Sequence, residues 1–387
     1  MRRNTRFYSD QEAIRIYNAN NIINFLQKQR KCTKQEIGKE LSLSIPTVTN
    51  NLNELLKKGI IEEIGRGKSS GGRRPWIYKF NPDGLLSQGI DITPHGVRSA
   101  IINLDGEMIE ILESSKVPKT RAQLFELILE YYHQAKSSVK SRKTGYAGLG
   151  IAMPGVVDID SRFLVTAVNL RLSAIDFGEL QSSIEDPFHI ENEANAAAIA
   201  EKQIYGSPND SDLLYLSITE GVGAGIFLHN SLYRGRRNKA GEIGHITLIP
   251  GGKKCNCGQS GCMERYVSEE ALLESFNTKC QAEVANLDEF IQRLGQNDKC
   301  AVSVWEQYLD YLALGIQNLL HMFDPATVII GGKLSLYSHL LEAQLSERLF
   351  SHEGLQTKSD AIIKCSRMSS DGALLGAALL SFEHLQF

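Results

Sequence analysis

One histidine and three cysteines lie within 18 positions near the middle of the chain. His245 is followed by Cys255, Cys257 and Cys262. Zn²⁺ prefers thiolate and imidazole ligands, and a structural zinc site fills all four coordination positions with protein side chains. The alternative reading is ordinary buried cysteines beside a hydrogen-bonded histidine, but clustering of sulfurs among glycines favours a metal. The sequence therefore predicts one structural zinc ion per chain. The glycines that allow tight turns here are Gly251, Gly252, Gly258 and Gly261.

Two carboxylates are interleaved with these metal ligands. Glu242 lies three positions before His245, and Glu264 lies two positions after Cys262. A zinc clamp would hold both carboxylates rigidly at a cleft, where they could accept hydrogen bonds from a polyhydroxylated ligand. The arrangement predicts a sugar pocket beside the metal.

The stretches AGEIGH (240–245) and CNCGQSGCMERYVS (255–268) resemble the signature of the ROK family, whose members are sugar kinases and sugar-responsive transcriptional repressors. With a helix-turn-helix before it, the chain is most similar to the xylose repressors among them. The resemblance implies an α/β actin-like ATPase or sugar-kinase fold with two lobes and a ligand cleft between them. It covers most of the chain and extends through GIAMPGVVD (150–158), ENEANAAAIAE (191–201), SITEGVGAG (217–225) and DPATVIIGGKLS (324–335).

The resemblance also implies which side chains contact the sugar. Carboxylates that accept from vicinal hydroxyls form strong charge-assisted bonds, and an analogue that lacks a hydroxyl leaves them unpaired. The alternative is that these acids form a solvated rim. The residues carried over are Gly155, Asn169, Asn192, Glu193, Glu242, His245 and Glu264.

The positions that hold ATP in the family's kinases depart from the kinase pattern. Their first phosphate loop reads Asp-hydrophobic-Gly-Gly-Thr, whereas residues 91–96 read DITPHG, and Pro94 has no N–H to donate. Their second loop reads Thr-hydrophobic-Gly-Thr-Gly, whereas residues 217–221 read SITEG, so Glu220 would repel a polyphosphate. Where the kinases carry a catalytic Asp, this chain has Glu193, which moves the carboxylate by one methylene. The sequence therefore predicts no kinase activity.

Glu193 also suggests which sugar binds. The longer side chain would occupy the space that a hexose C6 hydroxymethyl needs, so the hypothesis is a pentose such as D-xylose. The alternatives are a hexose, an amino sugar or a protein partner as the controlling ligand.

Length and composition bound the class of protein. With 387 residues the chain is long enough for two or three domains, and 42% apolar with 22% charged residues is typical of a globular protein. It contains no apolar run of membrane-spanning length and no signal-peptide h-region, so we expect a cytoplasmic protein with no membrane partner. Thiols outside the metal set are then expected to stay reduced, as core or incidental residues. These are Cys32, Cys280, Cys300 and Cys365.

Charge is distributed unevenly. Residues 1–80 hold 16 Lys and Arg against 7 Asp and Glu, a net charge of +9, whereas the remainder carries −12. A basic segment on an acidic body indicates a nucleic-acid partner.

The basic segment predicts a helix-turn-helix. An apolar face predicts a helix over 14–29, and Thr33 with Glu36 forms a capping box for a second helix. Ser44 caps a third helix with Pro46 in its first turn. Its buried side is expected to carry Ile45, Val48, Leu52, Leu55 and Leu56.

The polar face of this third helix is predicted to enter the major groove of double-stranded DNA. A plain helical hairpin with a solvated polar face is the alternative. Strands over 60–64 and 76–80 flank the glycine-rich tip GRGKSSGGRRP, which makes a wing suited to a minor groove or to phosphates. The candidate DNA contacts are Ser44, Pro46, Thr47, Thr49, Asn50, Asn53, Arg66, Lys68, Arg73 and Arg74.

The remaining pattern predicts the order of the other elements. A turn-rich linker (81–87) precedes a β-meander, a helix over 123–137 and an apolar strand over 145–153. The expected division is a winged helix-turn-helix domain (1–80), the linker, lobe 1 and lobe 2. Lobe 1 spans 88–193 with a carboxy-terminal helix (372–387), and lobe 2 spans 194–371 with the zinc knuckle and dimerisation helices. Further elements are expected at 194–203 (helix), 213–216 and 224–229 (strands), 302–323 (helix), 326–330 (strand) and 372–384 (helix).

Together these observations predict a sugar-responsive DNA-binding repressor that is induced by D-xylose and stabilised by one structural zinc ion. Operators read by such modules are inverted repeats that match a two-fold protein axis, so a homodimer or dimer of dimers is expected. One competing prediction is a sugar kinase with an added DNA-binding module. Another is an activator or corepressor-dependent regulator, which differs only in binding DNA more tightly when sugar binds.

Overall fold

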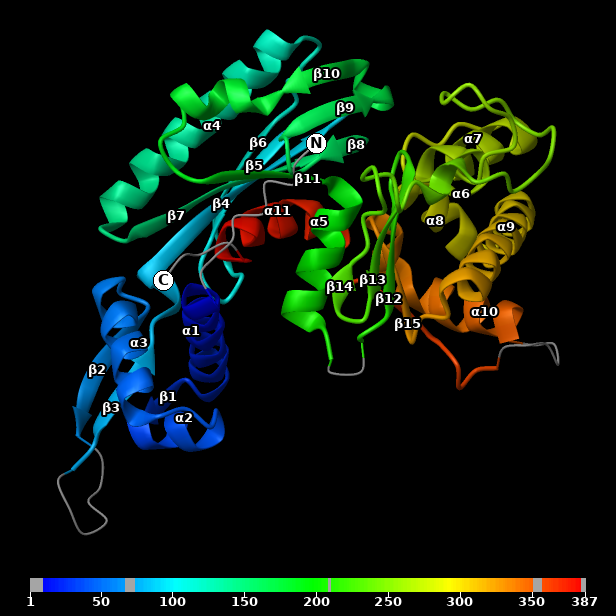
Figure 1. The fold of residues 1–387 in the computed structure, drawn as a ribbon. Coiled ribbons are helices and arrows are strands. Elements are labelled where there is room, and N and C mark those ends of the chain that lie inside the picture. The colour runs from blue at the N-terminus through cyan, green and yellow to red at the C-terminus, as the bar shows by residue number, and fades with distance from the viewer. Residues whose placement is uncertain (1–9, 67–73, 208–209, 351–356, 384–387) are drawn as a thin grey trace.

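The computed structural model describes residues 10–66, 74–207, 210–350 and 357–383, which form a small amino-terminal domain and two α/β lobes (Figure 1). Within these ranges, no helix combines the length and apolar character needed to cross a membrane.

The amino-terminal domain is a winged helix-turn-helix, as predicted. Three helices pack on an antiparallel sheet with strand order β1-β3-β2, around a core that includes Leu26, Leu52 and Tyr78. The short strand β1 was not anticipated. The elements are α1 (Asp10–Gln29), β1 (Lys31–Thr33), α2 (Lys34–Glu40), α3 (Ile45–Lys57), β2 (Ile61–Arg66) and β3 (Trp76–Phe80).

Side-chain caps start α2 and α3 where the sequence predicts them. Oγ1 of Thr33 accepts from the Glu36 N–H while the Glu36 carboxylate accepts from the Thr33 N–H, and Oγ of Ser44 accepts from the Thr47 N–H. The prediction that Ile45 is buried is wrong, because its side chain is 45% exposed in the first turn. The wing residues Lys68 and Arg73 lie outside the described part of the chain.

Lobe 1 is built on a mixed five-stranded sheet with order β11-β7-β4-β5-β6, in which the predicted meander is confirmed. Residues 85–87 of the expected linker belong to its central strand, so only 81–84 separate the domains, and this segment contains the 3-10 turn Pro82–Gly84. The large elements are β4 (Leu85–Thr93), β5 (Gly96–Ile102), β6 (Met108–Ser114), α4 (Arg121–Arg142), β7 (Gly145–Met153) and β11 (Phe188–Asn192). A small antiparallel sheet adds β8 (Val156–Asp158), β9 (Phe163–Ala167) and β10 (Leu172–Asp176).

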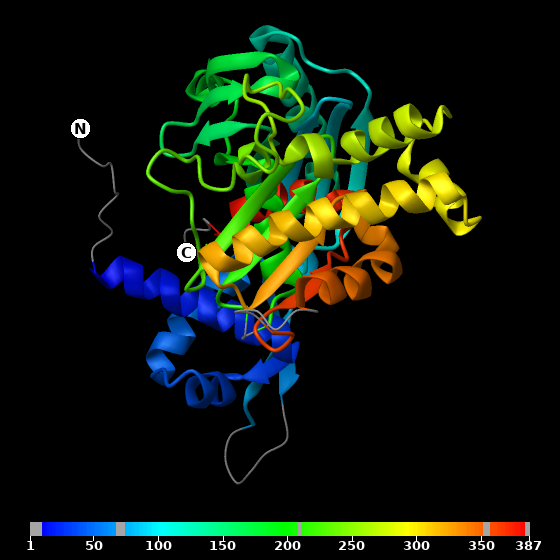
Figure 2. The same cartoon turned by 90° about the vertical axis from the view of Figure 1, so that its right-hand side faces the viewer.

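Lobe 2 contains a second five-stranded sheet, of order β14-β13-β12-β15-β16, and a helical region beside it (Figure 2). The core of this lobe includes Phe276, Phe290 and Trp305. Its strands are β12 (Leu213–Ile218), β13 (Val222–Leu228), β14 (Ser231–Leu232), β15 (Thr327–Gly331) and β16 (Ile362–Cys365). Its helices are α6 (Glu264–Val267), α7 (Glu269–Cys280), α8 (Leu287–Gly295), α9 (Lys299–Phe323) and α10 (Ser338–Phe350).

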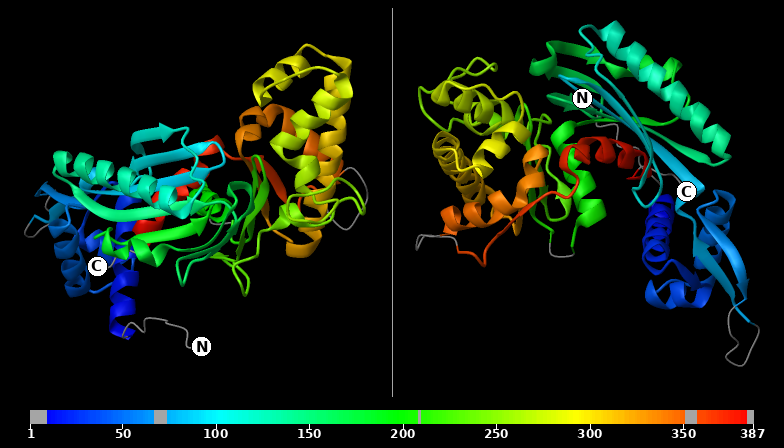
Figure 3. Two further views of the ribbon diagram at one scale, coloured as in Figure 1. Left: turned by 90° about the horizontal axis from the view of Figure 1, so that it is seen from above. Right: turned by 180° about the vertical axis from the view of Figure 1, so that it is seen from behind.

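Two small-residue helices, α5 (Glu193–Ala200) and α11 (Gly372–Glu383), lie between the two sheets (Figure 3). They touch through their backbones, since a Cβ on Gly376 would lie 1.7 Å from the carbonyl oxygen of Ala196. This contact links α5, at the ligand cleft, to the carboxy-terminal helix.

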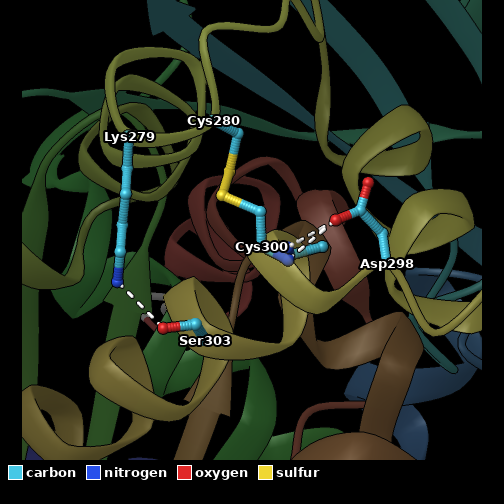
Figure 4. Close-up of a disulfide and its surroundings, with 6 residues drawn as sticks. Lys279, Cys280, Asp298, Cys300 and Ser303 are labelled. Carbon is cyan, nitrogen blue, oxygen red and sulfur yellow. Dashed lines mark hydrogen bonds between the residues drawn. A yellow bond between two sulfur atoms is a disulfide. The ribbon is translucent and has the colours of Figure 1, made fainter.

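Cys280 and Cys300 form a disulfide that joins the end of α7 to the start of α9 (Figure 4). Asp298 caps α9 beside it by accepting from the Cys300 and Ala301 N–H groups. The expectation that all cysteines outside the metal set are reduced is therefore wrong for this pair, which helix packing brings to a Cα separation of 5.8 Å.

Candidate functional site

The four predicted metal ligands converge in lobe 2. Nδ1 of His245 lies 3.7 Å from Sγ of Cys255, and Sγ of Cys257 lies 3.6 Å from Sγ of Cys262. All four ligand atoms lie within 4.8 Å of one another. The segment closes because Gly261 adopts φ +83° against the carbonyl of Ile249, where a Cβ would lie 1.8 Å from the oxygen.

These distances fit a tetrahedral metal. Zinc–sulfur bonds of about 2.3 Å place two sulfurs about 3.8 Å apart around a tetrahedral ion. Burial raises the pKa of Cys262 to about 12, and hydrogen bonds from its S–H to Cys257 and Cys255, with the charges of those two sulfurs, act in the same direction. The sulfurs would therefore not ionise together without a cation between them. The cluster can therefore hold a metal ion.

The two ring nitrogens of His245 face different neighbours. Nδ1 points at Cys255, while Nε2 lies 3.9 Å from Oε2 of Glu242. One nitrogen thus faces the cysteine cluster and the other faces Glu242 at the cavity beside it, so the two roles predicted for His245 use different nitrogens.

A cavity of about 540 Å³ lies next to the metal cluster, between the lobes. All seven residues predicted to bind sugar line it: Gly155, Asn169, Asn192, Glu193, Glu242, His245 and Glu264. Other polar residues that line the cavity were not predicted, although Asn238 and Lys239 stand directly before the AGEIGH stretch. The additional polar residues are Thr166, Asn195, Asn238, Lys239, Asn256 and Gln259.

The wall from lobe 1 is held by Asn192, the N-cap of α5. Its Oδ1 accepts from the N–H groups of Ala194 (2.8 Å) and Asn195 (3.1 Å), and its Nδ2 donates to the carbonyl of Gly155 over 2.9 Å. Position 155 requires glycine for two reasons: its φ is +90°, and a Cβ would lie 2.1 Å from the Thr166 carbonyl oxygen. The amide of Asn192 therefore serves chiefly to shape the wall.

Glu193 lies at the junction of this cavity with a second one. Its Oε2 is buried and has no hydrogen-bond partner in the described part of the chain. Burial, reinforced by the nearby Asp91, Glu242 and Glu220 carboxylates, raises the pKa of Glu193 well above its usual range. Burial likewise raises the pKa of Glu242. A hydroxylated ligand would bring the donor that Oε2 of Glu193 lacks among the described residues.

The second cavity, of about 390 Å³, lies where the two phosphate loops were expected. Pro94 and His95 form the tip between β4 and β5, and Nε2 of His95 lies 2.6 Å from Oε1 of Glu220 in the turn after β12. Burial raises the pKa of Asp91 to about 7 in the same cavity. The contact between His95 and Glu220 thus joins the two lobes at this cavity.

The predicted recognition surface lies on α3 and the wing. Asn50, Asn53 and Pro46 are exposed, whereas Thr47 and Thr49 are half-buried. Oγ of Ser44 is engaged within the helix cap, 2.8 Å from Oγ1 of Thr47.

On the wing, the guanidinium of Arg66 stacks 5.3 Å above the Trp76 ring, and Arg74 is exposed. Both cations flank the tip, where the net-positive wing would meet phosphates.

Comparison with known proteins matches both parts of the chain. The ROK family model covers residues 87–383, and a model described as winged helix-turn-helix DNA-binding covers residues 18–62. The xylose repressor of Bacillus subtilis (strain 168) is 32% identical over 359 residues, which span 89% of this chain and 91% of the repressor.

Two crystal structures share the fold. A ROK family transcriptional regulator, a homolog of the E. coli MLC protein, superposes with a TM-score of 0.82 over 95% of this chain and 96% of its own, at 23% identity. A ROK family glucokinase from Streptomyces griseus in complex with glucose and AMPPNP gives a TM-score of 0.68 at 24% identity, over 77% of this chain and 99% of the glucokinase. By the extent of the family match and the identity to the Bacillus repressor, this chain belongs to the ROK family.

Proposed function

We propose that this protein is a DNA-binding transcriptional repressor that releases its operator when a monosaccharide, D-xylose, enters the cavity between the lobes. The observation that carries the proposal is a polar, carboxylate-lined cavity in the same chain as an exposed recognition helix. A winged helix-turn-helix explains operator binding, and the cavity explains the response to a small molecule.

The chemistry of the cavity supports a sugar as the ligand. Glu193, Glu242 and Glu264 offer carboxyl oxygens, and Asn169 adds an amide that can both donate and accept. Vicinal hydroxyls can satisfy several of these groups at once, whereas an apolar ligand would leave them buried and unpaired.

Two arguments support xylose among the monosaccharides. The Bacillus subtilis relative is named a xylose repressor, and Glu193 has a longer side chain than the Asp of the kinases at the cavity wall. We expect the extra methylene to occupy the space of a hexose C6 hydroxymethyl. Calorimetric titration tests this directly, since equal affinities for glucose and xylose would contradict the argument.

We further propose that the protein transfers no phosphate. Pro94 lacks the N–H that a phosphate cradle uses, and the Glu220 carboxylate stands in the cavity where a nucleotide would place negative charge. A kinase with an added DNA-binding module is the competing function. ATP-dependent phosphorylation of xylose or glucose by the purified protein would establish it.

The metal is proposed to be one structural zinc ion per chain, held by His245, Cys255, Cys257 and Cys262. With all four positions filled by protein, the ion has no open site for chemistry and serves to fix Glu242 and Glu264 at the cavity. The protein is proposed to act in the cytoplasm as a homodimer or dimer of dimers on inverted-repeat operator DNA.

The test is fluorescence anisotropy of the purified protein on inverted-repeat DNA from the neighbourhood of its own gene, with no ATP present. Titration with xylose, glucose and N-acetylglucosamine should release the DNA with xylose alone. E264Q should raise the xylose concentration needed for release, whereas E270Q, on the exposed face of α7, should not. Tight, salt-sensitive binding that no sugar alters would refute these inducers and point to another ligand or a protein partner.

A further inference from the structure

A partly buried ion pair joins lobe 1 to lobe 2 beside the proposed sugar cavity. Nε and Nη2 of Arg234 donate to Oε2 of Glu191 over 3.0 and 2.6 Å. Arg234 follows β14 in lobe 2, and Glu191 stands near the end of β11 in lobe 1. The Glu191 side chain is 3% exposed and that of Arg234 is 27% exposed, so the carboxylate is buried and the guanidinium partly so.

On the lobe 1 side, Glu191 orders the start of α5. Its second oxygen, Oε1, accepts from the N–H of Asn192 over 2.9 Å and from Nδ2 of Asn195 over 3.0 Å. Four donors thus converge on one carboxylate, which satisfies it fully. The carboxylate fixes the turn that presents Asn192 and Glu193 to the cavity.

On the lobe 2 side, Arg234 anchors the loop that carries Glu242. The loop closes on itself, because the N–H of Ala240 donates to the carbonyl of Arg234 over 3.1 Å. Its end is bound to β13, where the N–H of Ala224 donates to the carbonyl of Gly241 over 2.8 Å. Moving the backbone at Arg234 would therefore move the segment that leads into Glu242.

One further contact ties this loop to lobe 1. Nδ2 of Asn238 lies 3.4 Å from Oδ1 of Asp158. This bond is longer than those of Arg234 and only one of its partners is charged, so it can assist the Arg234–Glu191 ion pair but not replace it.

From this geometry we infer that Arg234 is a positioning residue for the cavity: its ion pair with Glu191 sets the distance between Glu242 on one wall and Glu193 on the other. The inference rests on the proposed function for the identity of the ligand. The ion pair between Arg234 and Glu191, called the clamp below, is a feature of the chain itself. A ligand that bridges the walls needs both carboxyl groups in register, so loss of the clamp should weaken sugar binding more than operator binding.

The experiment compares R234M with R348M in the full-length protein. Arg348 is a matched control, because it also forms ion pairs in lobe 2, with Glu306 and Asp310, and its side chain is 21% exposed. Three quantities are measured for each variant: the xylose Kd by calorimetry, the operator Kd by anisotropy, and hydrogen exchange in segments 188–195 and 233–242.

We expect R234M to raise the xylose Kd about tenfold or more, to leave the operator Kd near the wild-type value, and to speed exchange in both segments. R348M should change none of these. An unchanged xylose Kd and unchanged exchange in R234M would overturn the clamp, as would an equal effect of R348M, which would indicate general destabilisation.

A double variant and the behaviour of the wild type distinguish the remaining outcomes. R234M leaves an unpaired buried carboxylate that can prevent folding, so R234M/E191Q, which removes both charges, should fold and still bind xylose weakly; wild-type affinity in this double variant refutes the inference. If the wild type itself binds no xylose, the proposed inducer is wrong, and the clamp is then judged on exchange alone.

Discussion

Nη1 of Arg30, directly after α1, donates a hydrogen bond of 2.5 Å to Oδ2 of Asp105 in the turn between β5 and β6. Nε2 of Gln27 adds bonds of 3.1 Å to the carbonyl of Leu104 and to Oδ1 of Asp105. Leu104 and Phe382 also pack against the apolar core of the winged helix-turn-helix domain. The DNA-binding domain is therefore docked on lobe 1.

Phe382 connects this docking surface to the cavity. It lies near the end of α11, which packs on α5 through the close contact of Gly376 with Ala196. Because α5 begins at the cavity wall, a shift of α5 on ligand binding would be passed to α11 and to the docked domain.

The first prediction concerns this route. F382A should keep operator affinity within about twofold of the wild type, because α3 is untouched, but should require more xylose for release. Anisotropy titrations measure both quantities. L336A, at a side chain that is 62% exposed in lobe 2, serves as the control. Wild-type release by F382A would show that the signal travels by another route.

The second prediction concerns the metal. Dialysed protein should contain one zinc per chain by elemental analysis, and C257S should lose it, lower the Tm and weaken xylose binding, because Glu242 and Glu264 flank the ligands. C365S, at a half-buried cysteine outside the cluster, should retain the metal. Wild-type metal content in C257S would contradict the four-ligand assignment.

The third prediction is a pH dependence. Burial, opposed by Arg98 but reinforced by Glu220 and Asp371, raises the pKa of Asp91 from 3.8 to about 7. A raised carboxyl pKa means that the folded state binds the proton more tightly than the unfolded state does. Burial of Asp91 therefore costs no stability below pH 3.8, and the cost increases with pH up to about pH 7. The full cost is at most about 4 kcal/mol.

D91N removes this cost. Its Tm relative to the wild type should therefore rise between pH 5 and pH 8, as followed by circular dichroism at both values. D160N, at an exposed position on the same lobe, should show a difference that does not change with pH. A constant Tm difference for D91N would mean that Asp91 is ionised without penalty in the folded protein.

Local chemistry predicted the elements better than their contacts. The capping groups of Thr33 and Ser44 and the apolar strand over 145–153 were identified from sequence, because each depends on neighbours a few residues away. Strand β1 was missed, since three residues carry too little periodicity to distinguish a strand from a turn.

Contacts between distant segments were not predictable in the same way. His95 and Glu220 stand 125 positions apart and meet only because the two lobes face each other. The sugar-site residues were identified through the family resemblance, and all seven line one cavity in the structure. The pairing of Cys280 with Cys300 depends on how α7 packs on α9, which no local pattern specifies.

The fourth prediction concerns this disulfide. Unfolded, chelator-treated protein should expose five reactive thiols before reduction and seven after it, in agreement with five free cysteines among seven. Closing a segment of 20 residues should stabilise the fold by about 3 kcal/mol in the chain-entropy account. Reduction should therefore lower the Tm of the wild type but not that of C280S/C300S. Seven reactive thiols without reductant would show that the pair is not joined.

The fifth prediction separates base reading from phosphate contact. Asn50 and Asn53 are exposed on α3, where short amides can pair with adenine edges in a major groove. N50A and N53A should each weaken operator binding by about 1–3 kcal/mol while changing binding to unrelated DNA little. R74A should instead weaken binding to both DNAs about equally. It should also reduce the slope of log K against log salt concentration by roughly the amount expected for one phosphate contact. Q292A, on the exposed face of α8, should change neither. If N50A and N53A retained full preference for the operator, base recognition would have to come from the wing, and α3 would only position the domain on the duplex.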